Sequence, residues 1–336
     1  MKNRILMIIL MVFAAATLTA GRYAGDFMMI GAGVRALGMG GAFSSIADDG
    51  SAMYWNPAGI SQIKKPEISA MHAFLYSGLA SYDHVTYCQP LPSDVTIGIN
   101  LTRLTVSDIP VFSETYLVGT NVDERINNSA LQLPGTPDGS FKSVDDLYQF
   151  SFAKHLHYDL NMGWLFFALP LDFYLGGNVK FIKRSLMDNQ GTGTGIDFGL
   201  KLNTDLGVLF DWEALGKLDF GLNFQDIAGT DISWDTYSEH RDKVLFNTKL
   251  GVAVSQPIPA LDSEVLLAYD YDYVYEGCSH YGAQISYKDL GAIRGGYYDK
   301  NLSFGASVNV YGVGIDYALV TNQIGITNRI GLRISF

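Results

Sequence analysis

The chain is poor in cysteine, poor in basic residues and, beyond its first twenty residues, without a long apolar run. Its two cysteines, Cys88 and Cys278, are too few for a disulfide framework. A net charge of -11 argues against nucleic acid as a partner. No later segment reaches the roughly 18 to 20 consecutive apolar residues of a membrane-spanning helix. The longest apolar run, Met162 to Leu171, is too short and is interrupted at Pro170.

The amino end has the pattern of a secretory signal peptide. Lys2 and Arg4 form a positive region, an apolar stretch runs from Ile5 to Ala16, and small residues near Ala20 offer a cleavage site. We therefore expect residues 1–20 to be removed. The mature chain is then exported without a helical membrane anchor.

Strict alternation of apolar and polar residues is the dominant pattern in the rest of the chain. At the carboxyl end, Ile330, Leu332, Ile334 and Phe336 share one strand face, because side chains repeat every two residues. About fourteen segments of the roughly 9 to 11 residues needed by a tilted membrane strand lie downstream of the signal. This pattern predicts an all-β fold, a transmembrane antiparallel β-barrel in the bacterial outer membrane.

In a bilayer each backbone polar group needs a partner within the protein, so the strands are expected to close into a ring. Charged residues at the polar positions of the strands are then expected to line the lumen. They are Asp197, Lys201, Asp219, Lys249, Asp270, Asp272, Arg294, Asp316 and Arg333. The alternative is a soluble β-sandwich or propeller with these residues on its solvated face.

Connection lengths give the barrel a direction. If the first strand starts in the periplasm, the long stretches Thr105 to Asp145 and Ala228 to Val244 lie outside, and several inner turns are short. The same topology places Cys88 at the inner end of the second strand and Cys278 in an outer loop. The two are then too far apart to form a disulfide.

A glycine-rich stretch precedes the first strand. Residues 31–60 read GAGVRALGMGGAFSSIADDGSAMYWNPAGI, which suits a compact, sharply turning segment rather than a membrane strand. A barrel of about fourteen strands has an interior that its own side chains do not fill. We expect residues 21–65 to fold into the lumen as an N-terminal plug, or hatch, and residues 66–336 to form the barrel.

Several of these motifs resemble a known family. GAGVRALGMGGAF and ADDGSAMYWNPAGI are similar to the opening of the PorV/PorQ family of outer-membrane proteins, which is related to the FadL-type long-chain fatty-acid transporters. The similarity continues through GLNFQDIAGTDISWDT, IRGGYYDKNLSFGASV, YGVGIDYALV and NRIGLRISF. The resemblance implies a fourteen-stranded barrel with a hatch. FadL-type members move hydrophobic molecules, whereas PorV-type members serve type IX protein secretion.

The resemblance also points to a candidate ligand site in the hatch. Asn56, Pro57 and Ala58 match the Asn-Pro-Ala motif of FadL-type hatches, and the flanking Tyr54 and Trp55 offer an apolar wall. The alternative is structural: Asn56 caps backbone groups of the plug, and the two aromatic side chains pack.

Charged residues of the plug are expected to fasten it to the lumen wall. These are Arg35 and the pair Asp48 and Asp49, which we interpret as anchors rather than as ligand-binding groups.

The leading functional hypothesis is capture or transport of hydrophobic small molecules, such as a fatty-acid-like ligand. Apolar residues of the long outer stretch provide a docking surface; they are Ile109, Val111, Phe112, Tyr116 and Leu117. By resemblance to the transporters, a kink or gap in the third strand, where Gly98 lies, would release the ligand sideways. The expected surroundings are outer-membrane lipid.

Two other functions stay open. The outer loops of a secretion component would hold cargo or partner proteins, and a purely structural barrel would transport nothing.

Catalytic motifs are lacking, so we predict neither an enzyme nor a cofactor. Gly31 to Ala36 fits a dinucleotide fingerprint but lacks the surrounding βαβ unit. His155 and His157 share a strand face without a third metal ligand, and we predict no metal site there.

Overall fold

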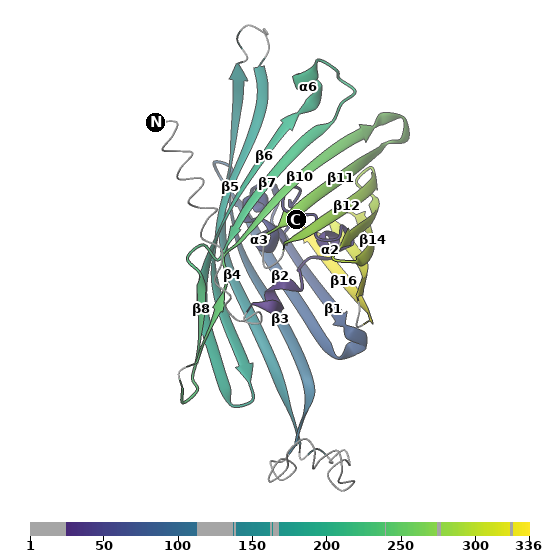
Figure 1. Cartoon of the computed structure of the whole chain (residues 1–336). Helices are drawn as coiled ribbons and strands as arrows, with labels where there is room; N and C mark the ends of the chain where they lie inside the picture. Colours follow the sequence, from purple (N-terminus) through teal and green to yellow (C-terminus); the bar gives the residue numbers. More distant parts are fainter. Residues whose placement is uncertain are drawn as a thin grey trace.

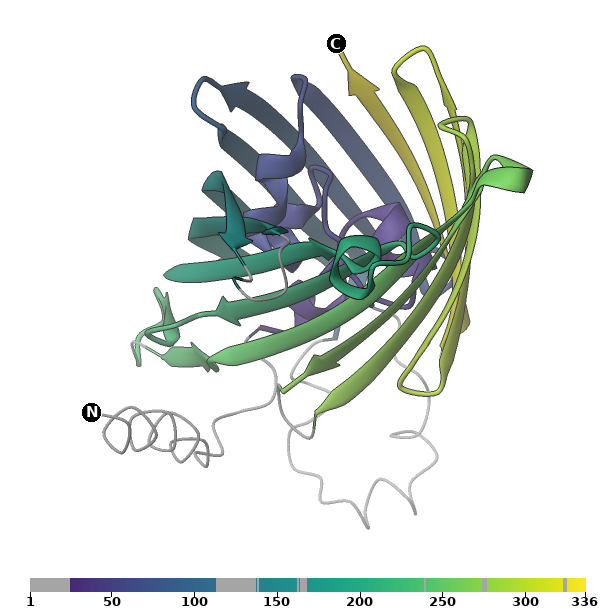
Figure 2. The same ribbon diagram turned by 90° about the horizontal axis from the view of Figure 1, so that it is seen from above.

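The computed structural model describes residues 25–112, 137, 139–161, 163, 168–238, 240–273, 277–322 and 325–336. Antiparallel strands curve into a barrel that surrounds the N-terminal part of the chain (Figures 1 and 2). The wall strands are β1 (Glu67–Leu75), β2 (Ala80–Leu91), β3 (Val95–Val111), β4 (Gly139–Asn161), β5 (Ala168–Leu186), β6 (Asn189–Asp205), β7 (Lys217–Gln225), β10 (Asn247–Ile258), β11 (Ser263–Asp272), β12 (Cys278–Tyr287), β13 (Gly291–Tyr298), β14 (Asn301–Val310), β15 (Val313–Asn322) and β16 (Gly325–Ser335).

Each wall strand pairs with two neighbours, and the ring closes where β1 meets β16 and where β5 meets β6. Of the sixteen strands in the sheet, β8 (Thr230–Trp234) and β9 (Arg241–Val244) form a hairpin that extends β7 and β10 outward, so that fourteen make the closed wall. The predicted antiparallel barrel of about fourteen strands is confirmed.

The structure differs from the sequence prediction mainly at the outer end. The stretch expected to be an outer loop is partly strand, because β3 continues to Val111 and β4 begins at Gly139. The hairpin of β8 and β9 was also not predicted. At the other end, β4 reaches Asn161 and β5 starts at Ala168, so only residues 162–167 connect these two strands.

The helices of the described residues are short. In the N-terminal segment, here residues 25–65, they are η1 (Asp26–Met29), α2 (Val34–Gly38), α3 (Ala52–Trp55) and η2 (Pro57–Gln62). Three more lie in connections between strands: η3 (Tyr76–Gly78), α6 (Leu206–Phe210) and η6 (Pro259–Leu261). Among the residues described, none of these helices has the length and apolar character to span a membrane.

The two faces of the wall divide as the alternation predicts. Outward side chains are apolar and exposed; Ile315 of β15, for example, is 57% exposed. The charged residues predicted to face the lumen are buried or half-buried on the inner face, among them Lys201, Asp270 and Arg294. An outward charge in the bilayer costs roughly 2 to 4 kcal/mol near its midplane, which explains the segregation.

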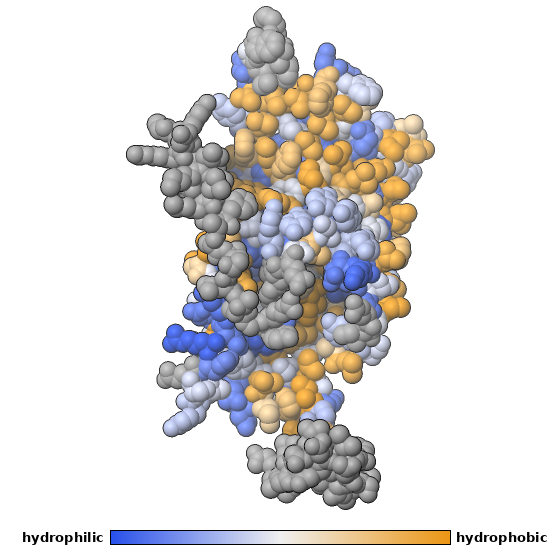
Figure 3. Space-filling view, viewed as in Figure 1, coloured by the Kyte–Doolittle hydropathy of each residue, from blue (hydrophilic) through white to orange (hydrophobic). Residues whose placement is uncertain are grey.

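A row of polar side chains interrupts the outward apolar face on one side of the barrel. His72, Asp83, Arg103, Asp146 and Lys183 lie opposite one another in register across β1 to β5. Arg103 Nε donates to Asp146 Oδ1 at 2.6 Å, and His72 Nδ1 lies 2.6 Å from Asp83 Oδ1. On β3 to β5 we interpret this row as the outer limit of the apolar surface that faces the bilayer. Figure 3 shows hydrophilic side chains gathered at lower left, where Figure 1 places β8.

The cysteines lie at opposite ends of the barrel, as the topology predicted. Cys88 is buried near the inner end of β2, opposite Glu67, and Cys278 begins β12 at the outer end. Both are free thiols.

The N-terminal segment lies inside the wall and contacts it nearly all the way round (Figure 2). At nine wall positions an inward glycine meets the segment so closely that a Cβ would collide with it or press against it. They are Gly98, Gly176, Gly199, Gly221, Gly251, Gly282, Gly296, Gly305 and Gly331. At Gly176, for example, a Cβ would lie 2.5 Å from Ala58 N. The absence of side chains therefore lets the two backbones touch.

Candidate functional site

The Asn-Pro-Ala motif lies at the contact between the N-terminal segment and β6. Asn56 is fully buried, and its side-chain amide donates to Ser44 O at 2.9 Å and to Leu200 O at 3.0 Å. Its Oδ1 accepts from Ala58 N at 3.2 Å, so that Asn56 caps η2, while Pro57 takes the first helical position. All polar atoms of the Asn56 side chain are thus engaged with backbone groups. These contacts favour the structural interpretation of the motif.

Tyr54 and Trp55 are also buried and bonded to the segment itself. Trp55 Nε1 donates to Ala32 O at 2.6 Å, and the Tyr54 hydroxyl accepts from Gly31 N at 3.2 Å while donating to Met28 O. The Trp55 ring lies edge-on to Phe43, with ring centroids 6.4 Å apart. The two aromatic side chains form the core of the segment rather than an open wall.

The charged residues expected to anchor the segment to the wall pair with each other instead. Arg35 contacts Asp48 directly, and its Nη1 lies 3.9 Å from Asp49 Oδ2. Burial alone would raise the pKa of Asp48, but the Arg35 guanidinium outweighs this effect and lowers that pKa below its usual value. Charges of the wall also act on these residues: Asp316 attracts Arg35, and Lys201 and Arg333 attract Asp48. Their direct ion pairs lie within the segment, and anchoring to the wall through the longer-range attraction stays a prediction.

The wall supplies the anchoring groups. Asp270 of β11 accepts from Phe43 N at 2.9 Å and from Ser44 N at 2.6 Å through one carboxylate oxygen. Lys201 of β6 donates to Ala47 O at 2.7 Å. Both wall residues were predicted to face the lumen. Sequence alternation placed them on the inner face, but it could not identify the backbone atoms they bind.

The predicted outer docking residues fall partly on the inner face of β3. Ile109 pairs with Phe141 of β4, and Val111 pairs with Gly139, beyond a register shift that starts at Val106. Because Phe141 alternates in phase with Leu147, Ile109 and Val111 lie on the lumen side of the extended wall. Phe112, just past the strand, is 50% exposed. Tyr116 and Leu117 lie outside the described residues.

Below this stretch is a buried apolar cluster that the sequence analysis missed; we call it the outer pocket because side chains of the wall enclose Phe27 of the N-terminal segment. Its walls are Leu147 of β4, Ile182 of β5 and Ile232 and Trp234 of β8, and it is filled by Phe27 of η1, which is 3% exposed. Leu147, Ile182, Gly193 and Ile232 stand side by side in register. Four strands thus converge on one aromatic ring.

Polar groups close the outer pocket on its outer side. The Arg184 guanidinium lies 5.8 Å from the centre of the Phe27 ring and 5.6 Å from that of Trp234. Asp145 holds Arg184 in place, accepting from its Nε at 2.8 Å, and Trp234 Nε1 donates to Asp242 Oδ2 at 2.8 Å. The pocket therefore combines an apolar lining with a fixed cation above an aromatic ring.

The regular hydrogen-bond ladder of the wall is interrupted beside the outer pocket. The ladder between β6 and β7 ends at Phe198, and the ladder between β6 and β8 covers Gly191 to Gly193. Between them, Ile227 N donates to Ile196 O at 3.0 Å. On the inner side, Lys180 Nζ lies 2.8 Å from a carboxylate oxygen of Asp197 and of Asp226, and this ion cluster holds the break closed.

The third strand has no gap at Gly98. Gly98 pairs with Cys88 of β2 and Ser151 of β4 in unbroken ladders. Its missing side chain makes room for Met53 of the N-terminal segment, whose Sδ would lie 2.7 Å from a Cβ at that position. The expectation of a lateral opening at Gly98 is therefore wrong, since the glycine serves packing.

The two remaining sequence motifs have structural explanations. Gly31 to Ala36 links η1 to the five-residue α2 inside the barrel, not a strand to a helix. His155 and His157 both contact Asp172 Oδ1, at 2.7 and 2.8 Å, so a carboxylate does lie between them. Within the described residues no group of three or more His, Cys, Asp or Glu side chains is arranged to hold a metal.

Comparison with known proteins supports the fold. No protein-family model matches the sequence, and comparison with curated proteins finds no match. Solved structures do match: the toluene transporter TbuX of Ralstonia pickettii has 13% identity and a TM-score of 0.51, with 91% of this chain and 98% of that chain covered. CymD, described as a monoaromatic hydrocarbon channel, has 12% identity and a TM-score of 0.52 over the same shares. At these identities the similarity shows a shared outer-membrane barrel fold.

Proposed function

We propose that this chain is an outer-membrane channel for hydrophobic small molecules, with residues 1–20 removed on export and residues 21–65 acting as its plug. The observation that carries the proposal is the apolar inner face of the outer wall. Its apolar residues on β3, Val111, Ile109 and Leu104, lead to the outer pocket beside the ion pair of Arg184 and Asp145. A ligand that leaves water at the rim finds apolar contact along this path.

The outer pocket also indicates the class of ligand. It already holds one aromatic ring, that of Phe27, beneath the Arg184 guanidinium. A single-ring hydrocarbon that replaces Phe27 would make the same contacts. The structural neighbours described as a toluene transporter and a monoaromatic hydrocarbon channel are consistent with this class. The resemblance to the PorV/PorQ family, and the secretion role it implies, stay predictions.

Uptake by intact cells tests the proposal. Cells that lack their own hydrophobic channels would express the protein and receive radiolabelled toluene or a labelled fatty acid. We expect uptake above that of cells with an empty vector, and Ile182→Glu to remove it, because the glutamate places a charge in the apolar pocket. The matched control is Asn309→Glu, on the inner face of β14 at its inner end and away from this path, where Arg333 Nη2 donates to Asn309 Oδ1, and it should retain uptake.

The folded state of each variant is checked by its heat-modifiable mobility in gels. No uptake by the wild-type chain, or uptake by folded Ile182→Glu equal to wild type, would contradict the proposal. Greater uptake of the fatty acid than of toluene would keep the channel but change the ligand class.

We further propose that ligands leave through the break between β7 and β8. Ile196 and Ile227 flank it and are 54% and 46% exposed on the membrane side, so its membrane side is apolar. A ligand would have to open the ion cluster of Lys180, Asp197 and Asp226 on the inner side. A disulfide between Ile196→Cys and Ile227→Cys, with Cys88 and Cys278 replaced by serine, should lower uptake until a reductant is added. A control disulfide between Ile285→Cys and Ile293→Cys, which pair across β12 and β13, should leave uptake unchanged in both states.

A further inference from the structure

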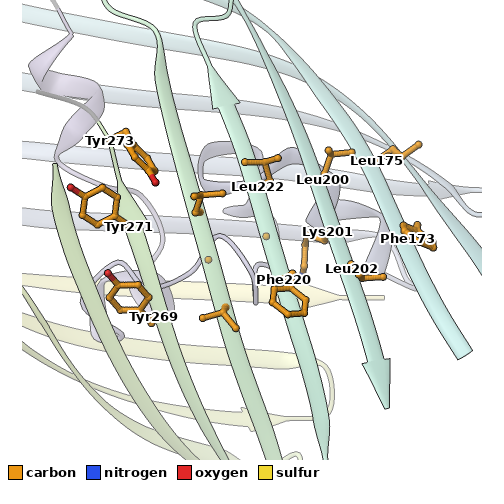
Figure 4. Close-up of a pocket in the computed structure, with 14 residues that line it drawn as sticks. Phe173, Leu175, Leu200, Lys201, Leu202, Phe220, Leu222, Tyr269, Tyr271 and Tyr273 are labelled. Atoms are coloured by element: carbon orange, nitrogen blue, oxygen red, sulfur yellow. The ribbon is translucent and has the colours of Figure 1, made fainter. Parts of the chain in front are cut away.

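A groove of about 830 Å³ is hollowed into the membrane-facing side of the wall, across β5, β6, β7, β10 and β11 (Figure 4). We call it the transverse groove. Its volume lies within the range of small-molecule binding sites. It lies on the outer face, whereas the outer pocket described above lies in the lumen.

Strand register explains the shape of the groove. Two outward rows of side chains run across the five strands, one along each side. The first row is Leu175, Leu200, Leu222, Leu250 and Tyr271, and the second is Phe173, Leu202, Phe220, Val252 and Tyr269. Neighbouring strands are about 4.8 Å apart, so the groove is roughly 20 Å long and lies across the strands.

Two glycines on the inner face account for its depth. Between the two outward rows lies an inward row in which Gly221 and Gly251 pair with each other. A Cβ at Gly221 would overlap the backbone of Ser44, and one at Gly251 would lie 2.5 Å from Ser44 Oγ. The wall therefore lies directly against the N-terminal segment here. Both glycines also line the groove, so backbone without side chains forms part of its floor.

The chemistry of the groove suits hydrocarbon. Its lining is mostly leucine, phenylalanine, valine and tyrosine. Lys201 is also at the groove, but its ammonium group points inward and donates to Ala47 O. At one side, Tyr271 and Tyr273 pack edge to face with ring centroids 4.6 Å apart, and the Tyr269 hydroxyl lies 3.2 Å from Ser279 Oγ. Aromatic side chains with hydroxyls are typical of the region where a bilayer meets water.

We propose that the transverse groove binds the acyl chain of an outer-membrane lipid. The groove is continuous with the apolar surface that faces the bilayer, it is long and narrow, and charge is absent from its outward lining. The N-terminal segment seals the wall behind it at Ser44, so the groove does not lead to the lumen. The bound chain fills the groove between the two outward rows of side chains.

Photocrosslinking tests the proposal. The full-length processed protein is reconstituted in vesicles of phosphatidylethanolamine that contain a trace of the same lipid with a diazirine on one acyl chain. After illumination, crosslinked peptides are mapped. We expect crosslinks to concentrate on β6, β7 and β10 at the groove. In Val252→Trp, whose indole fills the groove, they should fall to the level seen elsewhere on the wall.

The matched control is Ile315→Trp, which adds the same side chain to the convex outer face of β15 and should not change crosslinking at the groove. If Val252→Trp fails to fold, Leu250→Phe provides a smaller obstruction. Crosslinks spread evenly around the barrel, or unchanged in a folded groove variant, would overturn the proposal. If free palmitate displaced the probe and unlabelled phosphatidylethanolamine did not, the groove would bind free fatty acid, and the assignment to a membrane lipid would be overturned.

Discussion

Two parts of the N-terminal segment, the stretch from Gly38 to Ala58 and the stretch around Phe27, are held in different ways. From Gly38 to Ala58 the backbone touches wall glycines and receives hydrogen bonds from side chains such as Asn178 and Gln149, which both donate to Met53 O. At the other end, Phe27 is held mainly by apolar side chains of the outer pocket. Backbone contact at this distance leaves no room for adjustment, whereas an apolar pocket accepts any ligand of similar shape. The difference indicates a fixed body and an exchangeable tip.

The largest effect is expected when a side chain is introduced at a wall glycine that contacts the fixed body. Gly221→Val would drive its methyl groups into Ser44, and we expect a loss of about 3 kcal/mol or more in the free energy of unfolding, or failure to assemble. The measurement is urea unfolding in vesicles, followed by gel mobility. Gly139→Val is the control, since a Cβ there would meet nothing within 4 Å. Equal stability of the two variants would show that the body is not tightly fitted.

A second test separates the structural role of Asn56 from a ligand-binding role. Asn56→Ala removes two donated hydrogen bonds and one accepted bond, and should lower the free energy of unfolding by about 2 kcal/mol. Toluene uptake per folded molecule should not change, because the hydrogen-bond partners of Asn56 do not belong to the outer pocket. If Asn56→Ala instead reduced ligand binding without loss of stability, the result would support the ligand site that the sequence motif predicted.

Sequence alternation predicted the barrel well because the period of two is imposed by strand geometry at every position. Lys201, Asp270 and Arg294 were assigned to the lumen for that reason, and the structure confirms it. Short or polar strands carry a weaker signal. Asp108 and Pro110 interrupt the pattern near the end of β3, and Arg241 to Val244 of β9 has little apolar content, so the outer extension was not predicted.

The outer pocket could not be predicted because its parts are distant in the chain. Phe27, Leu147 and Ile232 come together only through the register of β4, β5, β6 and β8. The wall glycines were visible in the sequence, but a glycine does not reveal what it contacts. One available signal was the alternation of Gly191, Gly193 and Gly195 in β6, which indicates an inner face that another segment approaches closely; in the structure residues of β8 lie there.

A substitution in the exchangeable tip has the smallest expected free-energy effect, and it tests ligand binding directly. Phe27→Ala removes the ring that occupies the outer pocket, so a ligand no longer has to displace it. Toluene should therefore bind about tenfold more tightly, equivalent to about 1.4 kcal/mol, as measured by calorimetry on the protein in detergent. Met29→Ala is the control, because Met29 belongs to the same helix and is 48% exposed. Unchanged affinity in Phe27→Ala would mean that the ring does not compete with the ligand, and the tip would then be as fixed as the body.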